Sequence, residues 1–539
     1  MGRAARRGRV PDGIAANSSP HSLLYIAIVI GVFAVNIYRA SHQSITADEA
    51  FTWDFYVDKP FNWILIVYST NNHILHTLLC RLSVKALGLS ELTMRLPSLA
   101  GGLLYLAFVY KLCRLLFNNL WTFLLAILAL TLNPFITDYL SAARGYGMAL
   151  GFFTAALYFV MRFFHDEATA TNDNRVTAAA ILLGLSISAN IIFVFPAVAL
   201  AGILMLLRLV DAKHTGGWIQ KLWWIAGRVW LPFLCAAGLF LAIPLANARQ
   251  SDFYRYGKDS LRETTLSLVQ RSLFHQYNVW RPETIPDIVI RSARIATSWV
   301  VPALLALIVV TLAPVCWRWM RERDLHRLGN PDRAYLLIGA VFATSLGMLV
   351  AAHYLVGMLY PIDRTAIYLV GLLTLEWMLL IQKALAAPHW NRAIGMLAAA
   401  PVAIAILLFL GGFTTSYYYE WRYDAGTKRI FHLLEGRNQF SSSRQMKVGV
   451  DWKLDLSLNF YRQMYQADWL AKVLRDPPPE AGGFDYYVLL PEDEEATRKL
   501  GLRVIYRDPI SNQELAVPAP APALSSKNSF EQTGPRDSL

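Results

Sequence analysis

Apolar runs of about 20 residues recur along this chain of 539 residues, and they constrain its fold more than any other feature. A helix needs about 20 predominantly apolar residues to cross the hydrocarbon core of a bilayer. The chain is 55% hydrophobic and only 16% charged, so it is far less polar than an average soluble protein. The sequence therefore predicts an all-α polytopic membrane bundle.

About eleven segments have the length and hydropathy of membrane spans. We expect them at 22–39, 96–116, 120–138, 146–164, 177–192, 193–209, 229–246, 296–315, 335–356, 366–383 and 394–413. The pair that covers 177–209 forms either two spans or one long kinked helix. Asn190 and Pro196 favour a break between the two halves.

The distribution of Lys and Arg predicts how the bundle is oriented. The net charge of +12 would also suit a nucleic-acid partner, but the basic residues gather in short loops on the same side as the basic N-terminus. Such loops face the cytoplasm, so we expect no nucleic-acid partner. Residues 1–21 are then a cytoplasmic N-terminus and 22–39 an uncleaved first span. An odd number of spans places the C-terminal region outside.

The regions outside the spans differ in character. Within the membrane domain 22–413, two long outer loops cover 40–95 and 247–295. The first is rich in aromatic residues, which indicates helices along the membrane surface. Residues 414–515 are expected to form a small α/β domain, and the Pro-, Ala- and Ser-rich stretch 516–539 a disordered tail. The predicted elements are strands at 446–452, 484–490 and 502–507 and helices at 455–475 and 492–500.

Motifs for nucleotide, zinc or nucleophilic-serine chemistry are absent from the sequence. There is no Gly-rich phosphate loop after a strand, no nucleophile elbow and no zinc spacing. The four cysteines lie in or beside apolar segments, so we expect no disulfide framework and assign no metal ligands. Nucleotide-driven chemistry is therefore not expected, and energy has to come from an activated substrate or an ion gradient.

Asp48 and Glu49 follow the first span and give the best clue to chemistry. Charge so close to the hydrocarbon layer is costly and commonly functional. Thr46 and Glu49 also have the spacing of a capping box, which explains Glu49 without a catalytic role. Asp48 is not required by that box, although an acid in a first turn suits the helix dipole. Its carboxylate could accept the proton of an attacking hydroxyl or amine.

Asn72, His73 and His76 form the next polar group. The two histidines are three residues apart, so a helix would place them on one face. A metal site would need further ligands that the spacing does not reveal. Either they are satisfied by hydrogen bonds at the membrane interface, or the group lines a wet cleft and binds sugar hydroxyls.

Two arginines lie where outer loops meet spans. Arg144, followed by Tyr146, is in the turn between the third and fourth spans, and Arg364 is at the outer start of the tenth. Each either reaches toward the headgroups or binds phosphate bidentately. His353 and Tyr354 end the span before Arg364.

Two further basic residues are candidates on the long loop 247–295. Arg255 and Lys258 alternate with aromatic residues in the stretch 253–258. This pattern suits a sugar phosphate as well as a headgroup layer.

The order of these motifs resembles the GT-C superfamily of membrane glycosyltransferases, and within it the bacterial protein O-mannosyltransferase and lipid A aminoarabinose transferase group. The resemblance extends from the first span to about residue 385. It rests on four motifs in order: Asp48-Glu49-Ala50, Asn72-His73 leading into Arg95-Leu96-Pro97, Ala143-Arg144-Gly145-Tyr146, and Asp363-Arg364-Thr365.

The resemblance implies transfer of a sugar from a polyprenyl-phosphate carrier at the periplasmic face of a bacterial inner membrane. Asp48 would be the general base, and Glu49 matches the second acid of the pair. Arg364, and after it Arg144, would hold the carrier phosphate. We expect Asp48 and Arg364 to converge on one outer pocket. No cofactor is implied as a requirement, although some members use a divalent cation, which would lie near Asp48.

Two departures leave the acceptor open between protein, lipid and glycan. Many relatives have a His-Pro pair where this chain has Asn71-Asn72-His73, and residues 414–515 match no acceptor-binding module. Two other functions stay open: a transporter or flippase for lipid-linked or anionic substrates, and a non-catalytic subunit of an envelope assembly. A transporter would need charged residues near the midplane of several spans, whereas the polar groups here gather at one face.

Overall fold

The computed structural model describes residues 20–165, 170–210, 217–248, 256–275, 286–386, 389–438, 444–476 and 478–519. These residues divide into two compact units. A membrane unit is drawn from Met1–Gln43 and Phe51–Glu420, and a C-terminal unit is drawn from Ser44–Ala50 and Trp421–Leu539. The predicted helical membrane bundle with a small C-terminal α/β domain is confirmed.

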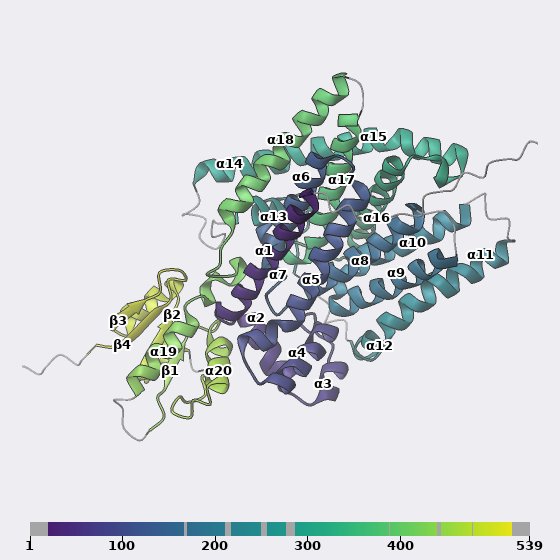
Figure 1. Ribbon diagram of the computed structural model, residues 1–539. Coiled ribbons are helices and arrows are strands. Elements are labelled where there is room, and N and C mark those ends of the chain that lie inside the picture. Colours follow the sequence, from purple (N-terminus) through teal and green to yellow (C-terminus); the bar gives the residue numbers. More distant parts are fainter. Residues whose placement is uncertain are drawn as a thin grey trace, which may run out of the picture. The chain divides into compact units, whose positions relative to one another are not determined.

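The membrane unit is built from helices (Figure 1). The long ones are α1 (Pro20–His42), α5 (Glu91–Leu116), α8 (Gly145–His165), α9 (Ala170–Ala189), α10 (Val194–Val210), α12 (Leu231–Asn247), α15 (Val301–Glu322), α16 (Asn330–Val356), α17 (Ile367–Ala386) and α18 (His389–Gly412). The shorter ones are α3 (Phe61–Ile66), α4 (Ile74–Leu87), α6 (Leu120–Thr131), α7 (Pro134–Tyr139), α11 (Trp218–Ile225), α13 (Leu261–Leu273) and α14 (Asp287–Ile295). Helix α2 (Ala47–Thr52) begins in the C-terminal unit and ends in the membrane unit.

Nine helical segments in the described part of the chain are long and apolar enough to cross a membrane, against the eleven predicted. The segment 120–138 is divided, because α6 ends at Thr131 and Asn133 caps the new helix α7 at Phe135. The segment 177–192 belongs to α9, whose first turns carry polar residues and lower its hydropathy. The break predicted near Asn190 is confirmed, since its side chain accepts a hydrogen bond from Ile192 N–H at 3.2 Å.

Close helix packing in the membrane unit depends on glycine. Helices α5, α8 and α9 lie side by side, with α12 against α9 (Figure 1). A Cβ atom on Gly101 of α5 would lie 2.4 Å from the Cα of Met148, and one on Gly151 of α8 would lie 2.5 Å from the carbonyl oxygen of Gly101. Small residues at such crossings let the helix backbones approach, as is common in membranes.

The C-terminal unit contains a four-stranded sheet in the order β1-β2-β4-β3. Its elements are α19 (Thr427–Asn438), β1 (Val448–Val450), α20 (Asp455–Met464), β2 (Tyr486–Leu489), α21 (Glu494–Lys499), β3 (Leu502–Arg507) and β4 (Glu514–Pro518). Strand β1 pairs with β2 in parallel, and the other two pairs are antiparallel.

The three strands predicted in this unit are confirmed, and the fourth was missed. Strand β4 continues to Pro518, so the domain extends past the predicted boundary at residue 515. The rest of the predicted tail, 520–539, lies outside the described residues. The helix predicted at 455–475 is shorter than expected and ends at Met464.

Candidate functional site

The capping box expected at the start of helix α2 is present. The backbone N–H of Thr46 donates to Glu49 Oε2 at 2.9 Å, and the N–H of Glu49 donates to Thr46 Oγ1 at 3.3 Å. Glu49 is fully buried, whereas Asp48 is half-buried. Glu49 therefore has a structural task at the helix end, and Asp48 takes no part in the box.

Residues 44–50 fold with the C-terminal unit, which the sequence did not indicate; they were predicted to belong to the loop 40–95 of the membrane domain. The N–H of Ala47 donates to Asp424 Oδ2 at 2.7 Å, and the N–H of Ile45 donates to the Tyr461 hydroxyl at 2.7 Å. Burial raises the pKa of Asp424 well above its usual value, and the charges of Asp48 and Glu49 raise it further.

Arg144 lies inside the membrane unit, in the turn between α7 and α8. It is only 1% exposed, so of the two alternatives left open by the sequence, the one in which it reaches toward the headgroups is wrong. Its guanidinium donates to Asn71 Oδ1 at 2.8 Å and to Thr52 Oγ1 at 3.3 Å. Its carbonyl oxygen accepts a hydrogen bond from Ser98 Oγ at 3.2 Å. Hydrogen bonds therefore join the buried Arg144 guanidinium to two residues of the outer loop 40–95, Asn71 and Thr52.

The two histidines lie beside this cation. His76 is fully buried, with Nε2 2.8 Å from Ser98 Oγ, and burial followed by the charge of Arg144 lowers its pKa to about 3. Burial also lowers the pKa of His73 well below its usual value, and the positive charges of Arg144, His76 and Arg364 lower it further. Both histidines are thus neutral at pH 7, and Arg144 and Arg364 act on the same imidazole.

Arg364 precedes helix α17, in the 3₁₀ turn Asp363–Ala366. Its guanidinium forms an ion pair with Glu420, and the Tyr139 hydroxyl donates a hydrogen bond to the same carboxylate. Burial raises the pKa of Tyr139, and the negative charge of Glu420 raises it further. The Tyr139 ring packs on that of Tyr146 at 4.9 Å, which connects this group to the turn that carries Arg144.

Asp363 and Arg271 form a second buried ion pair in the membrane unit. Arg271 Nε donates to Asp363 Oδ1 at 2.8 Å, and the Tyr256 hydroxyl donates to Oδ2 at 2.9 Å. Nη1 of Arg271 has no hydrogen-bond partner among the described residues, although Arg271 is 4% exposed. Its guanidinium also lies over the Tyr419 ring, 4.8 Å from the centroid. A buried guanidinium with donor capacity left over is suited to an anion.

The remaining predicted site residues lie in different surroundings. Lys258 is exposed, and its backbone pairs with that of Tyr360 through two hydrogen bonds of 3.1 and 2.8 Å. His353 stacks on the Tyr360 ring at 4.4 Å, whereas Tyr354 is 78% exposed. Arg255 lies outside the described residues.

Asn72 and Tyr146 contribute in different ways. The Asn72 side chain donates to the carbonyl oxygens of Ile64 at 2.9 Å and Val67 at 3.1 Å, so it closes the turn before α4. Its neighbour Asn71 is the residue that contacts Arg144. The Tyr146 ring meets that of His73 edge-on at 5.3 Å.

Two residues around these arginines, Arg271 and Glu420, were not singled out from the sequence. Arg271 is one of several basic residues in its loop, and Glu420 follows the last span as a single acid. Neither position carries a motif. Only the proximity of Asp363 to Arg271 and of Arg364 to Glu420, in the folded chain, marks them.

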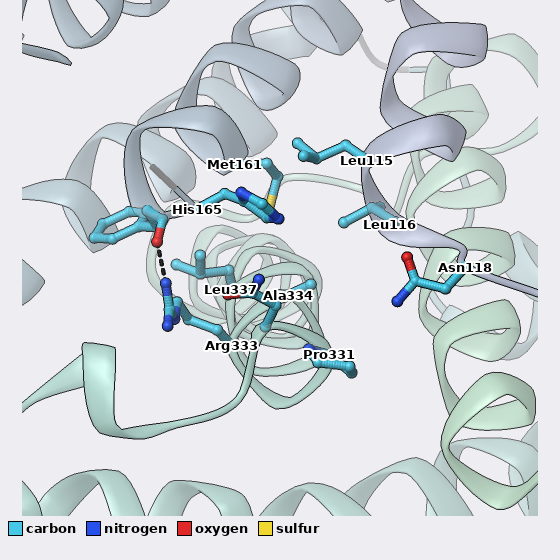
Figure 2. A pocket seen from close by; sticks show the side chains of 11 residues that line it. Leu115, Leu116, Asn118, Met161, His165, Pro331, Arg333, Ala334 and Leu337 are labelled. Carbon is cyan, nitrogen blue, oxygen red and sulfur yellow. Dashed lines mark hydrogen bonds between the residues drawn. The ribbon is translucent and has the colours of Figure 1, made fainter. Parts of the chain in front are cut away.

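A separate pocket lies where α5 and α8 end and α16 begins (Figure 2). Arg333 donates to the carbonyl oxygen of Phe164, in the last turn of α8, and to that of Leu328 at 3.0 Å. Carbonyl oxygens in the last turn of a helix lack partners within the helix, so Arg333 caps the C-terminal end of α8 through Phe164. No residue of the predicted site lines this pocket.

Comparison with known proteins gives similarity to solved structures alone, because no protein-family model and no curated protein matches the sequence. The chain is similar to ArnT from Cupriavidus metallidurans in the apo state, at 12% identity and a TM-score of 0.48 over 94% of this chain and 99% of that one. The same protein bound to undecaprenyl phosphate matches at 13% identity and a TM-score of 0.42, with the same coverage.

A second similar structure is the Archaeoglobus fulgidus oligosaccharyltransferase in complex with Zn and sulfate. It matches at 13% identity and a TM-score of 0.46 over 87% of this chain and 68% of that one.

Proposed function

We propose that this protein is an integral-membrane glycosyltransferase of the GT-C type, which moves a sugar from a polyprenyl-phosphate donor to an acceptor at the periplasmic face. The main observation in support is the cationic cluster of the membrane unit, in which Arg144 and Arg271 are buried and the side chain of Arg364 is 17% exposed. Arg144, Arg271 and Arg364 are held there together with the rings of Tyr139 and Tyr146. Phosphate matches a guanidinium group bidentately, so a cluster of three arginines suits a phosphate group.

Within this proposal Arg364 and Arg144 bind the donor phosphate, and Arg271 is a third contact. Nη1 of Arg271 supplies donor capacity that no described residue uses. Lys258 lies on the loop that joins this cluster through Tyr256 and is a further proposed phosphate contact; Arg255, which lies outside the described residues, stays a candidate from the sequence alone. The cations stabilise the negative charge that develops on the departing phosphate.

Asp48 is the proposed general base. The neighbouring Glu49 is engaged in the capping box, and Asp48 is the acid of the pair that takes no part in that box. It would take the proton of the acceptor hydroxyl or amine, and attack opposite the leaving phosphate would invert the anomeric centre. This role requires Asp48 and Arg364 to face one donor molecule, which remains a prediction.

Substrate contacts and cofactors complete the proposal. His73 and Tyr146 lie beside the cationic cluster and are the proposed sugar contacts, with Asn72, His76, His353 and Tyr354 as further candidates. The proposal assigns no required cofactor and leaves a divalent cation near Asp48 open. The transfer assay run with and without a chelator tests for a divalent cation near Asp48.

A transporter of lipid-linked or anionic substrates is the second candidate, favoured by one residue. Glu376 is fully buried in the middle of α17, and neither carboxyl oxygen has a hydrogen-bond partner among the described residues. An ionisable residue inside a span is a common mark of a transport pathway. The cationic cluster at one end of the bundle favours transfer over transport.

The test begins with mass spectrometry of surface glycans and glycolipids in a deletion strain, which identifies the sugar and the acceptor. Purified protein is then assayed with the corresponding polyprenyl-phosphate sugar. We expect Asp48→Asn to lower kcat by about 100-fold or more, the usual contribution of a general base. Asp58→Asn is the matched control, because Asp58 is an exposed acid of the same loop. Undiminished transfer by Asp48→Asn would exclude the assignment, and loss in Glu376→Gln alone would favour transport.

A further inference from the structure

The C-terminal unit contains the acidic motif itself, because residues 44–50 fold with residues 421–519. We propose that Asp424 and Tyr461 are positioning residues, which fix the backbone of residues 45–47 by hydrogen bonds and so hold the Asp48 carboxylate in its working orientation. The inference rests on the proposed role of Asp48 as the general base. It gives the C-terminal unit a task in catalysis that does not depend on recognition of the acceptor.

Asp424 completes the N-terminal end of α2. The first N–H groups of a helix have no partner within the helix. In α2 the capping box satisfies the N–H groups of Thr46 and Glu49. Asp424 Oδ2 accepts the N–H of Ala47, between them in the chain, at 2.7 Å. Asp48 follows Ala47 in the chain. Its side chain therefore projects from a backbone whose neighbouring residues, Ala47 and Glu49, are both held by hydrogen bonds.

Tyr461 fixes the residues that enter the helix. Its hydroxyl accepts the N–H of Ile45 at 2.7 Å and lies 3.2 Å from Ser44 Oγ. Ser44 Oγ in turn accepts the N–H of Lys428 at 3.3 Å. The Tyr461 side chain is fully buried on α20, beside the Phe431 ring of α19 at 5.9 Å. Two helices of the C-terminal unit therefore hold the segment before Asp48 in place.

Asp424 is proposed to position Asp48 through the hydrogen bond that it accepts from Ala47, and not through its charge. Asp424 is only 1% exposed and lies within electrostatic range of Asp48 and Glu49. Burial and these two negative charges raise its pKa well above the usual value, which favours the neutral acid. A neutral carboxyl still accepts the N–H of Ala47 through its carbonyl oxygen. An asparagine at this position would do the same.

The experiment measures kcat and donor KM for full-length protein in detergent, with Asp424→Ala, Asp424→Asn and Tyr461→Phe made in the wild type and in Asp48→Asn. We expect Asp424→Ala and Tyr461→Phe to lower kcat about tenfold and to change donor KM less than twofold. Asp424→Asn should stay within threefold of the wild type. In Asp48→Asn, where the base is absent, the same changes should cause no further loss.

Asn459→Ala is the matched control for a structural effect. Asn459 is also on α20, and its side chain forms hydrogen bonds of 2.8 and 3.0 Å with the backbone of Val473, whereas Asp424 and Tyr461 accept the hydrogen bonds from residues 45 and 47. It should lower the melting temperature and leave kcat unchanged.

Three outcomes would overturn the inference. They are a loss in Asp424→Asn equal to that in Asp424→Ala, a tenfold further loss in the Asp48→Asn background, or full kcat in Tyr461→Phe. Tyr461→Phe removes one hydroxyl, so it decides the matter even where Asp424→Ala does not fold. Full activity of Asp48→Asn by itself would instead refute the proposed general base, so the two failures are distinguishable.

Discussion

Replacing Asp363 by alanine tests whether the arginines of the membrane unit depend on their buried partner. Removing the carboxylate leaves Arg271 buried with neither its Nε bond to Asp363 nor a partner for Nη1 in the described residues. An uncompensated buried charge of this kind costs about 3–5 kcal/mol. Asp363 also has a φ of 50°, a left-handed conformation that costs alanine about 1 kcal/mol more. The expected loss for Asp363→Ala is therefore about 4–6 kcal/mol.

Asparagine at the same position should be much milder. Asn keeps an acceptor for the Tyr256 hydroxyl or for Arg271, and it tolerates the left-handed conformation. The remaining cost is the weakening of one charged hydrogen bond, about 1.5–3 kcal/mol. Asp332→Ala is the control, because Asp332 pairs with Arg318 and Lys383 but has a side chain that is 21% exposed. A partly exposed pair of this kind contributes about 1 kcal/mol or less.

The assay is the apparent melting temperature of each variant in detergent, together with the donor KM. We expect the order of melting temperatures to be wild type, Asp332→Ala, Asp363→Asn and then Asp363→Ala. The donor KM should rise in Asp363→Ala, because Arg271 and the adjacent Arg364 lose their fixed positions. If Asp363→Ala melted no lower than Asp332→Ala, the reasoning that burying Arg271 without the Asp363 carboxylate is costly would be refuted.

Three further predictions concern the same unit. Gly145→Ala should lower the free energy of unfolding by about 3 kcal/mol or more, since the new Cβ would lie 1.9 Å from a backbone oxygen of α9. Gly202→Ala in α10 is the control, because its Cβ would meet nothing within 4 Å, and this variant should melt no lower than the wild type. Glu420→Gln should lower the donor KM about fivefold, because a phosphate no longer competes with a carboxylate for Arg364; an unchanged KM would contradict this. Since the pKa of His76 is about 3 when folded and 6.5 when unfolded, His76 alone should lower stability by up to about 1.4 kcal/mol per pH unit as the pH falls below about 6.5; His73 adds to this slope, so His76→Asn should remove only the share that His76 contributes in pH-dependent melting.

Features that depend on a few neighbouring residues could be read from the sequence. The capping box of Thr46 and Glu49 and the break at Asn190 are local hydrogen-bond patterns, and both are present as expected. Three of the four strands of the C-terminal unit follow from local β-propensity. The segment 120–138 was misjudged, because its continuous hydropathy outweighed the cap at Asn133 and Pro134.

The partners of the charged residues could not be read in the same way. Arg144 has its contacts at Asn71 and Thr52, which are 73 and 92 residues away. Arg364 pairs with Glu420, beyond the last span, and Arg271 was indistinguishable by sequence from the other basic residues of its loop. Such pairs depend on which helix ends meet, and no local pattern contains that information.

The sequence by itself therefore determined that the chain is a helical membrane protein with a small α/β domain, because hydropathy and periodicity act through the solvent on each segment separately. It also located the acidic motif of Asp48 and Glu49 and two arginines of the candidate site, Arg144 and Arg364. Only the tertiary structure decided that residues 44–50 belong to the C-terminal unit, that Arg364 pairs with Glu420, and that Arg271 pairs with Asp363. The physical reason is that buried polar groups must find partners, and those partners are fixed by helix packing over long separations in the chain.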